Sequence, residues 1–273
     1  MPENVVWLTG MPRSGTNWFA QIFASHPDVR LKLCPLFSYE FKNACNEQSG
    51  ADEWHSLFRQ VYRTPGEYLD QEYLRREGLV PAFEKSGTEP PTLAIKTTRY
   101  HHLTEGLLEK CPEIRVVGII RHPCAAIHSW LSNPLEFPAE ADPMQEWRSG
   151  ACRKTGVGEF WGFDDWKLVA SLFLRLATRF PERFRIARYE AFVRQPEIEV
   201  LALFDWLGLS RSEQTLDFLR QSHARHDQHN RSVFKNPAVS TRWKRELAPA
   251  IIAAILQELA DTPLAQFLSD GDA

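Results

Sequence analysis

The sequence predicts an α/β fold in which a mostly parallel β-sheet is flanked by helices. Four short apolar runs have the length of buried strands, at residues 5–9, 92–97, 115–120 and 184–189. A segment with a helical pattern follows each run. Strands that alternate with helices form parallel sheets covered on both faces, and such sheets bind ligands beyond the carboxyl ends of their strands.

The helices are predicted from their periodicity and their end signals. The first is expected over about residues 17–24, and it ends at His26-Pro27 because the residue before a proline avoids helical torsions. Residues 134–158 are rich in Pro, Gly and charge, which predicts a long loop. Further helices are expected at residues 164–180, 197–207 and 249–260.

Length and composition indicate one globular domain over residues 1–273. Hydrophobic residues make up 43% of the chain and the formal net charge is -3, which argues against a broad nucleic-acid-binding surface. No apolar run approaches the roughly 20 residues of a membrane span. The start lacks the basic and small-residue pattern of a signal peptide, so we expect a cytoplasmic protein with neither nucleic-acid nor membrane partners. The five cysteines contain no C-x-x-C pair and are expected to be reduced.

A phosphate-binding turn is predicted at residues 10–17, Gly-Met-Pro-Arg-Ser-Gly-Thr-Asn, between the first strand and the first helix. Backbone N–H groups in this setting can surround a phosphate at the positive end of a helix. A P-loop would have lysine and then serine or threonine where this chain has Thr16 and Asn17, which disfavours ATP or GTP hydrolysis. Arg13 instead supplies a fixed cation, and Ser14 a short polar donor. A glycine-rich turn with an ordinary helix cap is the alternative.

Two segments carry a resemblance to a known family. Residues 12–18, Pro-Arg-Ser-Gly-Thr-Asn-Trp, resemble the 5′-phosphosulfate loop of sulfotransferases that use 3′-phosphoadenosine-5′-phosphosulfate (PAPS). Residues 115–129 are similar to the 3′-phosphate element of that family, a strand ending in Arg121 and a helix carrying Ser129. Together these residues can hold one phosphate from two directions, although each alone also fits a surface arginine or a helical serine. The resemblance implies a P-loop NTPase-like sulfotransferase fold, PAPS as donor, PAP as product and no metal.

Later segments extend the resemblance. Arg188-Tyr189-Glu190 is similar to a strand-end segment near the nucleotide. Residues 232–237 and 241–247 resemble the late loop of relatives that act on carbohydrates or protein tyrosines, and a solvated basic loop is the alternative. The resemblance therefore implies these donor-binding residues: Arg13, Ser14, Gly15, Thr16, Asn17, Trp18, Arg121, Ser129, Tyr189, Ser232, Lys235, Arg242, Trp243 and Lys244.

The catalytic residues are assigned by hypothesis. Relatives that act on phenols and steroids usually carry Lys-Thr-His with a catalytic histidine, whereas this chain has Lys96-Thr97-Thr98, so their base is absent. Arg13 and Lys96 would stabilise charge on the leaving oxygen, with Lys235 as a further cation. Glu40 is the expected base, because carbohydrate and tyrosylprotein relatives carry a glutamate after the first helix. Ser38, His101, His102 and Asp165 are the alternatives.

The same motifs predict a class of acceptor and leave two alternative functions open. The absent histidine and the late loop favour a carbohydrate or other polyhydroxyl acceptor, either a small molecule or a glycan. The cluster at residues 223–229 has no H-E-x-x-H pattern, which argues against a metal site. The alternatives are a P-loop kinase of a small metabolite and a noncatalytic sensor of a 3′,5′-bisphosphate nucleotide.

Overall fold

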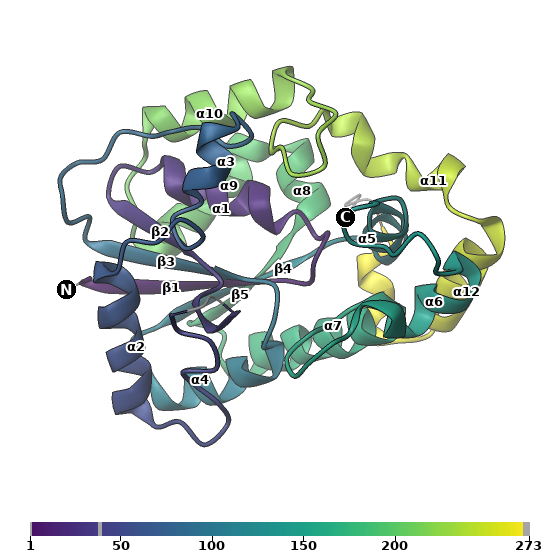
Figure 1. The fold of residues 1–273 in the computed structure, drawn as a ribbon, viewed down its shortest axis with the longest axis horizontal. Helices are drawn as coiled ribbons and strands as arrows, with labels where there is room; N and C mark the ends of the chain where they lie inside the picture. Colours follow the sequence, from purple (N-terminus) through teal and green to yellow (C-terminus); the bar gives the residue numbers. More distant parts are fainter. Residues whose placement is uncertain (1, 38–39, 270–273) are drawn as a thin grey trace.

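The computed structural model describes residues 2–37 and 40–269, and its strands form a parallel sheet in the order β2-β3-β1-β4-β5 (Figure 1). Trp7 of β1 pairs with Ile95 of β3 on one side and with Val116 of β4 on the other. The strands are β1 (Asn4–Thr9), β2 (Val29–Leu33), β3 (Thr92–Thr97), β4 (Arg115–Ile120) and β5 (Phe184–Arg188).

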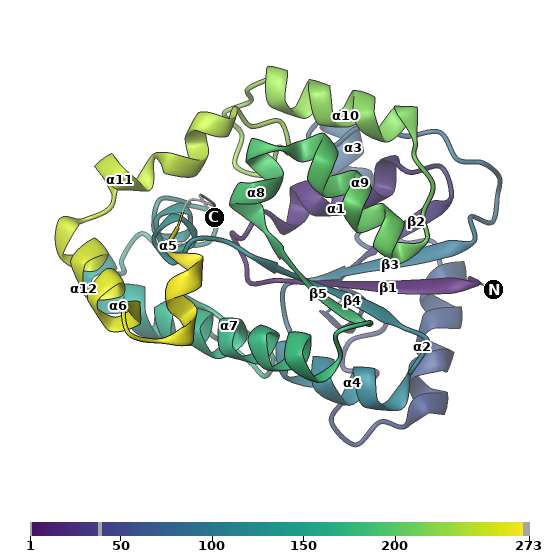
Figure 2. The ribbon, with the colours of Figure 1, turned by 180° about the vertical axis from the view of Figure 1, so that it is seen from behind.

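Helices cover both faces of the sheet and extend beyond the carboxyl ends of its strands (Figures 1 and 2). α1, α3, α8, α9 and α10 lie on one face, α2, α4 and α7 on the other, and α5, α6, α11 and α12 toward the carboxyl ends. Within the described ranges, no helix is both long enough and apolar enough to cross a bilayer. The helices are α1 (Thr16–Ser25), α2 (Ala51–Arg63), α3 (Glu72–Arg76), α4 (Thr104–Lys110), α5 (Pro123–Leu131), α6 (Pro143–Ser149), α7 (Gly162–Arg179), α8 (Tyr189–Arg194), α9 (Pro196–Leu207), α10 (Glu213–Ala224), α11 (Trp243–Glu246) and α12 (Pro249–Leu259).

Alternating strand residues build a separate core on each face of the sheet, because successive side chains of a strand point in opposite directions. Val6 and Leu8 of β1 pack in the cluster that contains Phe19 of α1. Trp7 packs in the other cluster, where its ring meets that of Trp54 of α2 edge to face at 5.9 Å. Burial on both faces explains why the strands read as continuous apolar runs. The predicted α/β fold, a parallel sheet flanked by helices, is confirmed.

The predicted long loop at residues 134–158 was wrong in part, because α6 and a 3₁₀ turn at Ala151–Arg153 lie inside it. The side chain of Asp142 accepts a hydrogen bond from the N–H of Met144, and Pro143 occupies the first turn. Gly150 ends the helix in the left-handed conformation at φ 62°. Helix-start and helix-end signals were therefore present, within a stretch too short for a periodic pattern to show.

Strand β2 was not anticipated from the sequence, because two charged residues interrupt its apolar pattern. Lys32 is nevertheless buried, and its ammonium lies 2.8 Å from a carboxylate oxygen of Asp70. Arg30 donates to the carbonyl of Tyr62 at 2.8 Å. Partners from other parts of the fold thus compensate the burial of charged residues whose sequence pattern alone would predict a surface segment.

Candidate active site

A pocket of about 850 Å³ lies beyond the carboxyl ends of β1, β4 and β5. One wall comes from the loop after β1, from Arg121 after β4 and from Tyr189 after β5, and residues between 226 and 245 form another. No aspartate or glutamate is among its described lining residues, although the whole chain carries a net charge of -3. The cationic lining residues are Arg13, Arg121, Arg231, Lys235, Arg242 and Arg245. The pocket therefore concentrates positive charge, which suits an anionic ligand.

The loop after β1 requires glycine at two positions. Gly15 has φ 83°, and a Cβ there would lie 2.3 Å from Cδ2 of Tyr189. A Cβ on Gly10 would lie 2.6 Å from the carbonyl oxygen of Ile119. Arg13 also has a positive φ of 68°, which is uncommon outside glycine. This turn leads into α1, whose first N–H groups have no acceptor within the helix and stand at the pocket wall.

The two predicted anion-binding elements meet in this pocket. Nε of Arg13 donates to Oγ of Ser129 at 3.2 Å. Nη1 of Arg121 donates to the carbonyl oxygen of Arg13 at 3.0 Å, and its guanidinium lies 4.7 Å from the centre of the Tyr189 ring. Nε of Arg121 is buried with no hydrogen-bond partner among the described residues. A buried donor without a partner is costly, so this atom indicates a place for an anion.

Lys96 lies directly behind the loop, at the end of β3. Its Nζ donates to Oδ1 of Asn17 at 2.9 Å, and the residue is only 5% exposed. Burial lowers the pKa of Lys96, while Cys34 and Glu136 oppose this shift. The ammonium therefore stands next to a residue that lines the pocket, in surroundings that strengthen electrostatic interactions.

Aromatic side chains form a further part of the wall. Nε1 of Trp18 donates to Oγ of Ser222 at 3.0 Å, and the Trp18 ring meets Tyr189 edge to face at 6.1 Å. Burial raises the pKa of Tyr189, which keeps its phenol protonated. The two rings leave a surface on which a base could pack.

The late segment contributes only some of its predicted residues to the lining. Ser232, Lys235 and Arg242 line the pocket. Trp243 does not, because its buried ring stacks on His122 with ring centres 4.4 Å apart. Lys244 also lies outside the lining, with its ammonium 5.6 Å from the centre of the Trp243 ring. Among the predicted loop residues, Ser14 is buried beneath the turn rather than in the lining.

None of the predicted bases lines the pocket in the described part of the chain. Glu40 is exposed, and Ser38 lies outside the described residues. His101 is buried and shares a hydrogen bond of 2.8 Å with Thr9, and burial lowers its pKa to about 3. His102 lies outside the lining, with its ring stacked on that of Phe160. Asp165 accepts the backbone N–H of Trp161 at 2.7 Å and pairs with Lys154.

Sequence reasoning missed a carboxylate beside the loop. Oε2 of Glu136 lies 3.5 Å from Nη1 of Arg13. Burial lowers the pKa of Arg13, and Glu136 is the largest influence in the opposite direction. Nothing in the local sequence pattern marks Glu136, because its proximity to Arg13 arises only from the fold.

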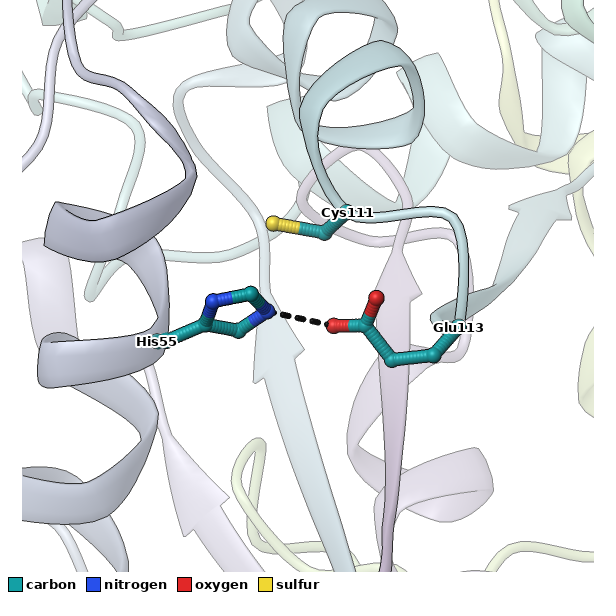
Figure 3. A group of neighbouring side chains, drawn as sticks. All are labelled: His55, Cys111 and Glu113. Atoms are coloured by element: carbon teal, nitrogen blue, oxygen red, sulfur yellow. Dashed lines mark hydrogen bonds and ion pairs between the residues drawn. The ribbon is translucent and has the colours of Figure 1, made fainter.

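A separate cluster lies at the opposite end of the sheet, close to the amino end of β4. Nε2 of His55 on α2 and Oε1 of Glu113 are 2.7 Å apart, with the thiol of Cys111 nearby (Figure 3). Within the described ranges, these side chains form the one group of three potential metal ligands. Burial raises the pKa of the Cys111 thiol to about 12, which disfavours the thiolate that a metal binds. The pair of His55 and Glu113 is explained by its hydrogen bond.

Comparison with protein families identifies the family of this chain. The model of the sulfotransferase family matches residues 6–213. The chain belongs to the sulfotransferase family. The matched residues include the loop after β1 and the end of β4, which line the cationic pocket. The predicted family membership is confirmed.

Solved structures agree with this sulfotransferase fold. Mouse sulfotransferase SULT7A1, complexed with PAP, has a TM-score of 0.60 at 14% identity, over 98% of this chain and 89% of the mouse chain. The sulfotransferase domain of the Synechococcus PCC 7002 olefin synthase has a TM-score of 0.53 at 15% identity, over 96% of each chain. Retinol dehydratase, in complex with androsterone and PAP, has a TM-score of 0.52 at 12% identity, over 100% of this chain and 83% of that chain. No curated protein matches this sulfotransferase.

Proposed function

We propose that this sulfotransferase transfers the sulfuryl group of PAPS to a hydroxyl group of a carbohydrate or other polyhydroxyl compound. The observation that carries the donor assignment is a pocket with five arginines and one lysine and no carboxylate among its described lining residues, in a chain of net charge -3. Two neighbouring proteins of the same fold are complexed with PAP, which supports the same nucleotide here. The acceptor assignment rests on the resemblance of residues 232–247 to carbohydrate and tyrosylprotein relatives.

The two ends of the donor are assigned to different parts of the pocket. Arg121 and Ser129 would bind the 3′-phosphate, because the unpaired Nε of Arg121 is available to an anion. Trp18 and Tyr189 would flank the nucleoside. The 5′-phosphosulfate would lie on the loop after β1, against Arg13, Gly15, Thr16 and Asn17.

The remaining predicted residues take supporting roles in this proposal. Ser232, Lys235 and Arg242 would close the far side of the donor. Trp243 and Lys244 would hold that wall from behind, and Ser14 would support the turn from beneath. Arg13 and Lys96 would stabilise the charge that develops on the bridging oxygen as the sulfuryl group leaves. This chemistry requires no metal ion.

The test is radiolabelled sulfuryl transfer. Purified protein is incubated with [³⁵S]PAPS and a panel of glycans, glycolipids, phenols and peptides, and labelled products are separated. Transfer to polyhydroxyl acceptors is expected. Tight PAP binding with no transfer to any acceptor would instead indicate a nucleotide sensor, and ATP turnover without PAPS would indicate a kinase.

A further inference from the structure

Glu136 lies in a hydrogen-bonded turn at the edge of the donor pocket. The N–H groups of Glu136 and Phe137 both donate to the carbonyl of Asn133, at 3.0 and 2.8 Å. Phe137 is buried, and its ring packs edge to face on Trp130 at 5.2 Å. The backbone that carries Glu136 is therefore anchored to the core.

The carboxylate of Glu136 faces the catalytic cations. Oε2 lies 3.5 Å from Nη1 of Arg13, and the negative charge of Glu136 partly opposes the lowering of the Lys96 pKa by burial. Arg13 belongs to the loop assigned to the 5′-phosphosulfate, and Lys96 contacts Asn17 of that loop. Glu136 itself is not among the lining residues of the donor pocket, so it stands beside the donor site and not within it.

The side chain of Glu136 is partly accessible from outside the donor pocket. Oε2 is buried and accepts no hydrogen bond from the described residues, although the Glu136 side chain as a whole is 29% exposed. A bound sulfonate would compete for the guanidinium of Arg13 and release Oε2 from the ion pair. Because Oε2 itself is buried, the exposed area lies on the rest of the side chain, and an acceptor that enters from this side would meet the Glu136 carboxylate beside Arg13.

Two other carboxylates near the pocket have partners of their own. Glu190 accepts the backbone N–H of His122 at 2.9 Å. Glu246 lies 3.2 Å from Nε2 of His128 and 3.0 Å from Nε of Arg242. His122 follows Arg121 and His128 precedes Ser129, so these two carboxylates are held next to the residues assigned to the 3′-phosphate.

We propose that Glu136 is the general base of the reaction, an inference that rests on the proposed function. The carboxylate of Glu136 takes the proton of the acceptor hydroxyl, and the acceptor oxygen forms a bond to sulfur. The bond between sulfur and the bridging oxygen breaks, and its electron pair passes to the 5′-phosphate of PAP. Arg13 and Lys96 stabilise the charge on that phosphate.

The test compares Glu136→Gln with the wild type on two classes of acceptor. One acceptor is the alcohol found by the radiolabel screen, which must lose a proton during transfer. The other is a nitrophenol assayed in buffer where it is already ionised, which needs no base. We expect Glu136→Gln to lose roughly 10²-fold or more in kcat with the alcohol and to keep most of its activity with the nitrophenolate. Glu140→Gln, an exposed glutamate of the same segment, is the matched control and should resemble the wild type with both.

The possible outcomes distinguish a failure of the base assignment from a failure of the proposed function. PAP binding by calorimetry should persist in Glu136→Gln, because the substitution removes a negative charge from beside an anion site. An equal loss of activity with both acceptors would show that Glu136 only positions Arg13, and unchanged activity with the alcohol would remove it from the reaction. Absence of PAP binding or of any transfer by the wild type would overturn the proposed function itself, and with it the base.

Discussion

Arg121 connects the two ends of the pocket through one guanidinium. It supports the loop by donating to the carbonyl of Arg13, it packs over the ring of Tyr189, and it retains one buried N–H without a partner among the described residues. A buried donor without a partner costs about 1–3 kcal/mol. A ligand that accepts a hydrogen bond from this N–H removes that cost, because the N–H is already out of contact with water. A single arginine can thus organise the loop and bind the anion.

The protonation of His101 predicts how the free energy of unfolding depends on pH. Its folded pKa is lowered to about 3, mainly by burial, from an ordinary value of 6.5, so the unfolded chain binds a proton that the folded chain excludes. This group therefore contributes stability that is present above about pH 6.5 and is lost as the pH falls toward 3, at up to about 1.4 kcal/mol per pH unit. Urea unfolding at several pH values in this window measures the slope.

The variant His101→Gln isolates this contribution from that of titrating carboxylates. We expect a lower free energy of unfolding than the wild type at neutral pH, because the bond to Thr9 is disturbed, but a shallower loss in acid. His229→Gln, at an exposed position, should keep the slope of the wild type. Parallel curves for His101→Gln and the wild type would show that His101 does not control the acid response.

At the scale of the element, the loop after β1 and helix α1 act as one unit. Gly15 ends the loop and begins the helix, and its lack of a side chain lets the Tyr189 ring pack directly against the backbone. Tyr189 is the first residue of α8 and directly follows β5. The contact between Gly15 and Tyr189 therefore connects the segment after β1 with the segment after β5. The geometry of the phosphate-binding turn therefore depends on a packing contact as well as on its own torsions.

Gly15→Ala tests this dependence, with Gly78→Ala as a matched control. Both glycines have positive φ, 83° and 69°, but nothing lies within 4 Å of a Cβ added at Gly78. Gly78→Ala should therefore lose only the backbone cost of about 1–2 kcal/mol. Gly15→Ala should lose more and should also weaken PAP binding, because the turn must move away from Tyr189. Equal losses in urea unfolding, with unchanged PAP affinity, would contradict this account.

The elements also show what local sequence can predict. β1, β3 and β4 are mostly apolar runs buried on both faces, so their composition predicts them, whereas β5 is only partly buried. β2 was missed because Arg30 and Lys32 find partners only in the folded chain. The same distinction holds in the site: Arg121 and Ser129 form a motif along the chain, whereas Glu136 becomes a candidate only through its distance to Arg13.

At the scale of the whole molecule, the parallel sheet brings together segments that are far apart in the sequence. The ends of β1, β4 and β5 meet at one edge, and the segment at residues 226–245 faces them across the pocket. The cations on these segments repel one another when no anion is bound. A ligand that neutralises several of them at once should therefore stabilise the entire fold.

Nucleotide-dependent stability tests this view of the molecule. PAP at about 100 times its dissociation constant should raise the free energy of unfolding by about 2.7 kcal/mol, measured by urea unfolding. ADP, which lacks the 3′-phosphate, should give a smaller increase at the same concentration, because the contact with Arg121 is missing. In Arg121→Ala the two nucleotides should become nearly equal, while Arg211→Ala, at an exposed position, should keep the difference. Equal stabilisation of the wild type by PAP and ADP would show that Arg121 and Ser129 do not bind a 3′-phosphate.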